Sequence, residues 1–255
     1  MTHTNRRLLG GARAVAGVLR AGMVVPLWWS RKPGSPSARR LERRFFEHVR
    51  NGFGVSIEVR GELAVADGTL FVANHISWAD IVVLGSLLDA HFVSKAEVAG
   101  WPLIGPLARR QGPVFVDRER RRHVSGQADA IRERLAAGGS VILFPEGTTA
   151  DGRELLPFRT SLFAAADAAR RIQPIALTYV APDGGPLPLD RLAEIAWVGD
   201  QALLPNARAL ARAASRAIIR PAPPIDPRDF PDRKAIADHV RAAIRAAYGV
   251  PPGGA

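Results

Sequence analysis

Short apolar runs alternate with longer helical stretches from residue 55 onward, and this alternation constrains the fold more than any other feature of the chain. Short strands separated by helices are typical of α/β domains, in which helices cover a parallel or mixed sheet. We therefore predict an α/β domain over residues 53–250, with a mixed, largely parallel sheet flanked by helices. The strand candidates are 56–60, 69–73, 91–94, 114–116, 141–144, 175–179, 194–198 and 217–220, and the helix candidates are 80–88, 121–137, 161–170, 204–214 and 234–248.

The composition excludes several classes of protein. At 255 residues and 47% hydrophobic, the chain can bury a core and is too apolar to be disordered as a whole. It has no cysteine, which excludes disulfides, iron–sulfur clusters, cysteine-based zinc sites and a thiol nucleophile. No stretch of 18 residues lacks charged side chains, so we predict no simple transmembrane helix. We expect the proline-rich stretch 221–231 to connect to the last helix, and residues 251–255 to form a disordered tail.

Positive charge is concentrated at the N-terminus. The formal net charge is +11, and residues 1–50 hold 11 of the 35 basic residues but 2 of the 24 acidic ones. This segment therefore carries +9, and the other 24 basic and 22 acidic residues leave +2 for the remainder. A basic segment on a near-neutral body indicates attachment to nucleic acid, to an anionic membrane surface or to an import system.

The apolar residues of this segment favour the membrane. Residues 8–30 contain two arginines and end in Trp28 and Trp29, and tryptophans beside a basic helix are typical of a membrane interface. A second basic, amphipathic helix is predicted over 37–49. We predict that residues 1–52 form a two-helix element docked on the cytoplasmic face of the inner membrane. The alternative is a pair of ordinary helices packed on the body.

The first candidate for chemistry is His75 with Asp80. An apolar strand candidate runs directly into His75, and Asp80 then opens a helix candidate. Active sites of α/β proteins lie at the carboxyl edge of the sheet. An aspartate can hold one imidazole nitrogen and leave the other to take a proton, so His75 is our candidate general base. Taken alone, an ordinary polar histidine and a helix-capping aspartate explain the spacing more simply.

Three further polar groups follow strand candidates. Glu146 and Gly147 belong to a Pro-Glu-Gly turn that can aim a carboxylate and backbone amides into a cleft, although a solvated turn is the simpler interpretation. Arg118 follows the strand 114–116 and can bind a phosphate through two N–H groups. Lys95 ends another strand and is the only lysine in the body before residue 234, where arginine is otherwise the rule, which makes a specific ammonium role plausible.

Several familiar motifs are absent from the sequence. It has no Gly-x-Ser-x-Gly, no phosphate-binding loop ending in Gly-Lys-Ser/Thr, no Gly-x-Gly-x-x-Gly and no His-Glu-x-x-His. Without a protein nucleophile of these kinds, a His–Asp pair must activate a group on the substrate. A hydroxyl is the natural choice.

Taken together and in order, four motifs resemble those of the glycerolipid acyltransferases, especially bacterial 1-acyl-sn-glycerol-3-phosphate acyltransferases. They are His-x4-Asp at 75–80, Phe-Val-Asp-Arg at 115–118, Phe-Pro-Glu-Gly-Thr at 144–148 and Pro-Ile at 174–175. The resemblance covers about residues 55–200. It implies an α/β fold, an N-terminal two-helix membrane element, and acyl transfer from acyl-CoA or acyl carrier protein to a lysophospholipid in the membrane. The mechanism we expect needs no metal or tightly bound cofactor.

The resemblance also implies roles for individual residues. His75 would be the general base and Asp80 its orienting partner. Lys95 and Arg118 would hold the acceptor phosphate; Glu146, Gly147 and Thr148 would bind the acceptor and shape the site; and Pro174 and Ile175 would line the acyl side. Thr149 stands where many members have arginine, so one phosphate contact is absent or comes from Arg153 or Arg159.

The acceptor and the class of function each have alternatives. Lysophosphatidate is the first acceptor that we expect, and another lysolipid such as lyso-ornithine lipid is the alternative. Two rivals from other classes are a non-enzymatic basic binder of membrane or nucleic acid, and a hydrolase that uses the same pair with water. The near-neutral body is poorly suited to a nucleic-acid groove, so we expect no nucleic-acid partner.

Overall fold

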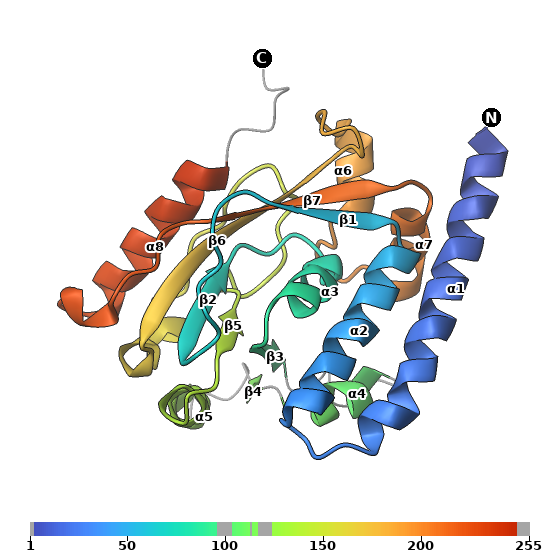
Figure 1. Cartoon of the computed structure of the whole chain (residues 1–255). Coiled ribbons are helices and arrows are strands. Elements are labelled where there is room, and N and C mark those ends of the chain that lie inside the picture. Colours follow the sequence, from blue (N-terminus) through green and yellow to red (C-terminus); the bar gives the residue numbers. More distant parts are fainter. Residues whose placement is uncertain (1–2, 96–103, 113, 117–123, 249–255) are drawn as a thin grey trace.

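The computed structural model describes residues 3–95, 104–112, 114–116 and 124–248, and its centre is one seven-stranded sheet (Figure 1). The strand order is β1-β7-β6-β2-β5-β3-β4. Neighbouring strands are parallel except β6 and β7, which are antiparallel. The predicted fold class is therefore confirmed. The strands are β1 (Val55–Val59), β2 (Thr69–Ala73), β3 (His91–Lys95), β4 (Val114–Val116), β5 (Val141–Leu143), β6 (Arg171–Val180) and β7 (Ser215–Pro221).

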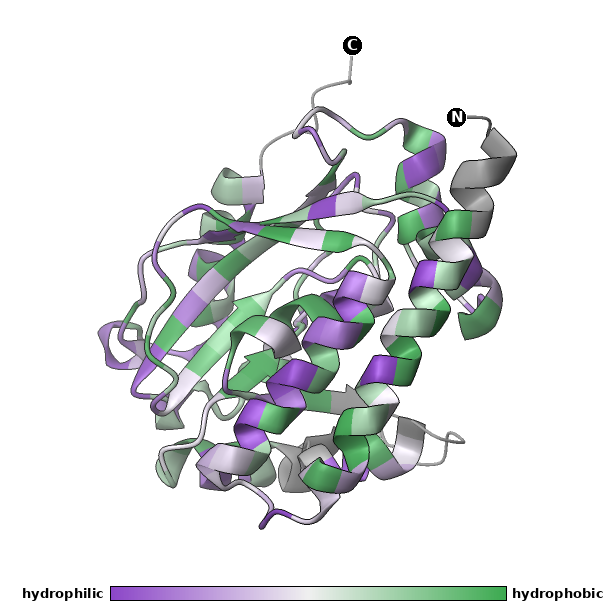
Figure 2. Cartoon of the chain, turned by 45° about the vertical axis from the view of Figure 1, so that its right-hand side comes forward, coloured by the Kyte–Doolittle hydropathy of each residue, from purple (hydrophilic) through white to green (hydrophobic). Residues whose placement is uncertain are grey.

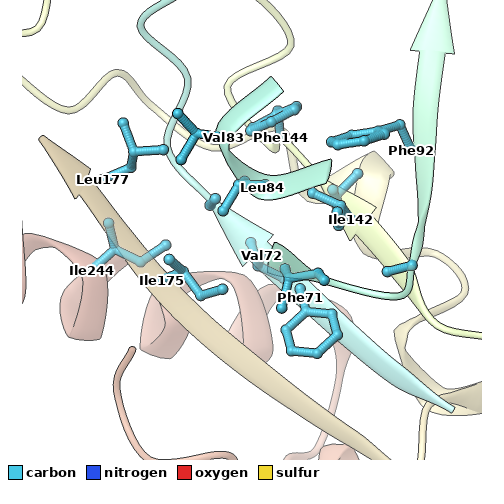
Figure 3. Close-up of a cluster of buried hydrophobic side chains, with 14 of the residues drawn as sticks. Phe71, Val72, Val83, Leu84, Phe92, Ile142, Phe144, Ile175, Leu177 and Ile244 are labelled. Carbon is cyan, nitrogen blue, oxygen red and sulfur yellow. The ribbon is translucent and has the colours of Figure 1, made fainter. Parts of the chain in front are cut away.

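The centre of the sheet is apolar because its strands are buried on both faces. All five residues of β2 are buried, as continuous hydrophobic runs in parallel sheets usually are. Figure 3 shows Phe71 and Val72 of this strand among side chains from β5, β6 and the helices on both sides. This packing fixes β2, and with it the residues that follow Ala73.

Eight helices surround the sheet in the described part of the chain. They are α1 (His3–Trp29), α2 (Pro36–Gly52), α3 (Trp78–Leu87), α4 (Ile104–Gln111), α5 (Val124–Ala136), α6 (Leu189–Ile195), α7 (Leu203–Ala211) and α8 (Arg233–Tyr248). Helices α1 and α2 form an antiparallel hairpin on one side of the molecule, and α8 lies on the other side against β6 (Figure 1). No helix in these ranges is long and apolar enough to cross a membrane.

Two predicted elements were wrong. The strand predicted at 194–198 is instead the end of α6 and a loop, because its polar backbone groups bond elsewhere: Asn206 donates to the Ala196 carbonyl, and the Trp197 amide donates to Ile76. The helix predicted at 161–170 is instead two short 3₁₀ turns. There, the Arg132 guanidinium takes the Ala164 carbonyl that a continuing helix would use.

The second helix of the hairpin is packed on the body. The Phe46 ring of α2 lies directly over Gly85 of α3, where an added Cβ would be 2.6 Å from the ring, and it also contacts Phe92 edge-on. Trp28 of α1 is buried against Phe45. Only the second member of the tryptophan pair, Trp29, is exposed. Helix α2 therefore packs on the body through this face, and membrane docking of the hairpin stays a prediction.

Helices α1 and α2 approach closely at two glycines. A Cβ on Gly17 would lie 2.4 Å from Gly52 Cα and 2.7 Å from the His48 carbonyl oxygen, both of them backbone atoms. Gly22, one and a half turns later, has open space around it.

We expect Gly17→Ala to lower the free energy of unfolding by about 1–3 kcal/mol, because the hairpin must separate to admit the methyl group. Gly22→Ala, on the open side of the same helix, should instead be neutral or raise stability by up to about 1 kcal/mol through helix propensity. Chemical denaturation of the two variants measures the difference. Equal effects would show that the close approach does not hold the hairpin together.

Candidate active site

The fold places His75 immediately beyond the carboxyl end of β2, beside Asp80 in the first turn of α3. The His75 Nδ1 and Asp80 Oδ2 atoms are 2.8 Å apart. The His75 side chain is 14% exposed and the Asp80 side chain 0%. The pair predicted from spacing is thus formed, with the carboxylate buried and the imidazole reaching the surface.

Asp80 is held by four hydrogen bonds in all. Its Oδ2 atom also accepts from the Ile76 and Ser77 amides, at 2.6 and 2.9 Å, and its Oδ1 atom accepts from the Tyr179 hydroxyl at 2.6 Å. Ser77 is the residue that caps α3, and Asp80 completes the capping box from the third helical position. Because every partner donates to the carboxylate, its two oxygens are fixed in place.

The buried carboxylate determines which imidazole nitrogen is free. A carboxylate accepts hydrogen bonds, so His75 Nδ1 carries the proton that it donates to Asp80, and Nε2 has the lone pair. The ring stacks on Phe144 at 4.0 Å between centroids, with 11° between the planes. The imidazole is therefore oriented from one edge and one face, as a general base requires.

Glu146 faces inward and binds backbone. Its Oε1 atom accepts from the His75 amide at 2.7 Å and its Oε2 atom from the Leu156 amide at 3.0 Å. The residue is 3% exposed. Burial raises the pKa of the Glu146 carboxyl to about 7. The hydrogen bonds from the two backbone amides lower this pKa, but they offset only part of the rise. These contacts make Glu146 a positioning residue for His75.

This raised pKa predicts a pH dependence of stability. The folded protein holds the Glu146 proton more tightly than the unfolded chain, whose carboxyl has the ordinary value of 4.5. The stability from this proton is present below about pH 4.5 and is lost as the pH rises to about 7. Between pH 5 and pH 8, we expect the wild type to lose about 1–3 kcal/mol more than Glu146→Gln. Exposed Glu154 offers the control, and a Glu154→Gln protein should follow the wild type in denaturation at each pH.

The sequence is similar to those of known proteins. Residues 56–178 match the protein family described as Acyltransferase. A lyso-ornithine lipid O-acyltransferase from Rhizobium meliloti is 40% identical over 200 residues, which cover 75% of this chain and 67% of the relative. This chain belongs to the acyltransferase family. A 1-acyl-sn-glycerol-3-phosphate acyltransferase from Neisseria gonorrhoeae is 38% identical over 114 residues, or 44% of this chain and 45% of that protein.

A solved structure shows the same fold. The 1-acyl-sn-glycerophosphate acyltransferase of Thermotoga maritima matches this acyltransferase with a TM-score of 0.69 over 96% of both chains, at 19% identity. Its coverage extends the likeness to the N-terminal helices. Within the described residues, no group of three or more His, Cys, Asp or Glu side chains is placed to hold a metal ion.

The other residues predicted for the site of this acyltransferase lie in the turn after β5 and on β6. Gly147 takes a φ of +71° in the turn after β5, where glycine is the favoured residue, and Thr148 beside it is exposed. Pro174 and Ile175 lie on β6 opposite Val72 and Ala73. Ile175 is fully buried in the core, and its part in lining the acyl side stays a prediction.

The structure places some of the residues predicted to bind the acceptor phosphate. Lys95 ends β3, at the same carboxyl edge as His75, while Arg118 lies outside the described residues. The Thr149 hydroxyl donates to the Trp197 carbonyl, so this residue ties the turn to the loop after α6. Of the two arginines considered as replacements, Arg159 packs over Gly147, and Arg153 pairs with Asp151 at 3.7 Å.

Two residues of the site were missed by sequence reasoning. Tyr179 reaches Asp80 because β6 lies beside β2, and strand order is not readable from local sequence. Phe144 was recognised only as part of its motif, and its contact with His75 follows from β5 being the other neighbour of β2.

Proposed function

We propose that this acyltransferase moves a fatty acyl chain from a thioester donor to the free hydroxyl of a lysolipid. The observation that carries the proposal is the His75–Asp80 pair at the carboxyl edge of the sheet, with Nε2 directed away from a buried carboxylate. Within the described residues, no protein hydroxyl or thiol is hydrogen-bonded to the His75 imidazole, so this base acts on a hydroxyl that the substrate brings.

In the proposed reaction, His75 Nε2 takes the proton of the acceptor hydroxyl as the oxygen attacks the thioester carbonyl. The negative charge that develops on the carbonyl oxygen is stabilised by backbone amides near the turn after β5. The C–S bond then breaks, the thiolate of acyl-CoA or acyl carrier protein leaves, and the proton held by His75 neutralises it. The ester product and free thiol balance the reaction, and no cofactor enters it.

Two acceptors are compatible with this mechanism. Lysophosphatidate follows from the motif set, with Lys95 and Arg118 as phosphate ligands. Lyso-ornithine lipid is favoured by a separate observation: the relative of that name matches at 40% identity over 75% of the chain, whereas the glycerophosphate relative matches over 44%. Thr149 also favours lyso-ornithine lipid, because it stands where an arginine would be expected to bind a phosphate.

The deciding experiment is mass spectrometry of the products formed by purified protein from a labelled acyl thioester and a panel of lysolipids. Acylated product from one or both acceptors, lost in His75→Ala, supports the proposal and identifies the headgroup. Release of free fatty acid at the same rate with and without lysolipid would instead establish a hydrolase. Running the panel with acyl-CoA and with acyl carrier protein identifies the donor.

We also propose that α1 docks on the cytoplasmic face of the inner membrane, where a lysolipid acceptor resides. Four apolar residues spaced four apart, Val15, Leu19, Met23 and Leu27, form an exposed stripe along the helix. Figure 2 brings the hairpin forward and shows α1 with mostly hydrophobic turns and α2 with mostly hydrophilic ones. An exposed apolar stripe beside a basic helix suits a helix that lies in one leaflet.

A further inference from the structure

A second site is suggested by a cavity at the edge of the sheet opposite His75. The cavity has a volume of about 560 Å³ and lies where the turn between α1 and α2 meets α4, α5 and the start of β3. It is lined by Trp29, Pro33, Gly34, His91, Pro106, Arg109, Arg110, Gly112 and Arg134. None of these lining residues is acidic, and we call this space the hairpin cavity.

The hairpin cavity is separate from the catalytic pair. His91 pairs with Val141 at the start of β5, and the same residue of β5 pairs with Leu70 at the start of β2. His75 follows the other end of β2, five residues beyond Leu70. With the rise per residue of a β-strand, His91 and His75 are therefore separated by roughly 15 Å along the strand direction.

Two guanidinium groups converge on one imidazole at this cavity. Arg39 and Arg134 both donate to His91 Nε2, the latter at 2.8 Å. Because a guanidinium only donates and an imidazole nitrogen has one lone pair, the two guanidinium groups share His91 Nε2 as an acceptor. Two positive charges are thus held beside one another in partly buried positions.

The nearby carboxylate compensates this charge only in part. Asp89 lies 3.3 Å from Arg39 Nε, and its side chain is 45% exposed. Burial lowers the pKa of Arg134, and the charge of Arg39 lowers it further. Arg110 adds a third guanidinium, which donates to the Trp28 carbonyl at 2.9 Å and lies 5.6 Å from the centre of the Trp29 ring. Like charges gathered in a cavity are stabilised by an anion that binds between them.

The chemistry of the lining indicates a phosphate group. Guanidinium groups bind phosphate oxygens with paired N–H donors, and they are the preferred cations for this purpose. The volume of the cavity falls in the range of small-molecule sites, which leaves room for an organic group attached to the phosphate. The exposed Trp29 beside it is the residue type found at the level of lipid headgroups.

We propose that the hairpin cavity is a phosphate-binding site distinct from the catalytic centre, and that the phosphate it takes belongs to the headgroup of an anionic phospholipid. The site would hold the tip of the α1–α2 hairpin at the membrane surface while the reaction proceeds at the other edge of the sheet. The same chemistry would admit free phosphate, so the experiment includes both probes.

Isothermal titration of the full-length protein tests the site with two probes, monomeric dihexanoyl phosphatidylglycerol and inorganic phosphate. The lipid monomer should bind the wild type and His75→Ala alike. In the double variant Arg39→Gln/Arg134→Gln we expect Kd to rise about tenfold or more, because two charge-assisted contacts are lost. The control Arg233→Gln/Arg245→Gln removes two exposed arginines from distant α8 and should not change Kd.

A second pair of variants protects the test against misfolding of the double variant. Gly34 lies at the rim with a φ of +74°, and an added Cβ would meet nothing within 4 Å. Aspartate and asparagine both tolerate this conformation, so Gly34→Asp adds a charge that Gly34→Asn lacks. Weaker lipid binding in Gly34→Asp alone supports the site.

Four results would overturn the proposal in whole or in part. An unchanged Kd in the folded double variant, or equal Kd values for the two Gly34 variants, would remove the site. Loss of binding in His75→Ala would move the lipid to the catalytic centre. Inorganic phosphate binding as tightly as the lipid monomer would keep the anion site but overturn its assignment to a headgroup.

Discussion

Replacing His75 with alanine is expected to lower kcat by about 10²–10⁴ while leaving the fold intact, which is the usual contribution of a general base. The side chain reaches the surface and its described contacts are with Asp80 and Phe144, so its removal costs the main core one ring contact, the one with Phe144. Acyl transfer measured with saturating lysolipid checks the loss, and circular dichroism checks the fold. Near wild-type turnover by folded His75→Ala protein would falsify the proposed mechanism.

The partners of His75 should show graded effects. Asp80→Asn should lower kcat, but it also disturbs the amides of Ile76 and Ser77 and therefore the start of α3. Tyr179→Phe is the cleaner variant because it removes one hydrogen bond to Asp80 and no substrate contact is expected of it. We expect about a tenfold fall in kcat from this loss, with KM unchanged and the pH profile displaced. A stability change with an unmoved pH profile would show that Tyr179 is only structural.

The local part of this site could be predicted from sequence. The apolar run of β2 followed by His75, and the short distance along the chain to Asp80, are set within one strand, one turn and one helix start. The same holds for the turn at Glu146, which follows an apolar strand. Periodicity and turn chemistry operate over such distances, so both were identified without knowledge of the sheet.

The non-local part could not be predicted in the same way. Glu146 was expected to face the substrate, but β5 lies beside β2, and the carboxylate therefore reaches the His75 amide. Tyr179 meets Asp80 because β6 is the other neighbour of β2. Strand order decides both contacts, and it depends on how helices cover the whole sheet. The strand predicted at 194–198 failed for a related reason, because Asn206 satisfies its backbone from another helix.

Membrane docking of α1 is better tested by substitution than by deletion of the N-terminal segment. Deleting residues 1–50 would remove Phe46, which packs on Gly85 and Phe92 in the main core. Such a protein would lose stability together with any membrane contact. Substitutions on the exposed stripe of α1 avoid this problem, because Leu19 and Met23 are 64% and 71% exposed and contribute little to the fold.

We expect Leu19→Glu/Met23→Glu to lower partitioning onto anionic vesicles at least about 100-fold, since each lost apolar insertion costs about 1.5–3 kcal/mol. Activity on lysolipid in a bilayer should fall with it, while activity on a short-chain lysolipid dispersed as monomers should persist. Ala242→Glu/Ala246→Glu is the matched control, with the same charges four residues apart on the exposed side of α8.

Flotation of vesicles with each protein measures the partitioning. High salt should release the wild type only in part, because the inserted side chains are not screened whereas the basic residues of the hairpin are. If both double variants float equally well with anionic vesicles, the membrane contact lies elsewhere on the body. If both lose binding equally, added negative charge alone accounts for the loss. Retained monomer activity in the α1 variant separates delivery to the bilayer from the chemistry at His75.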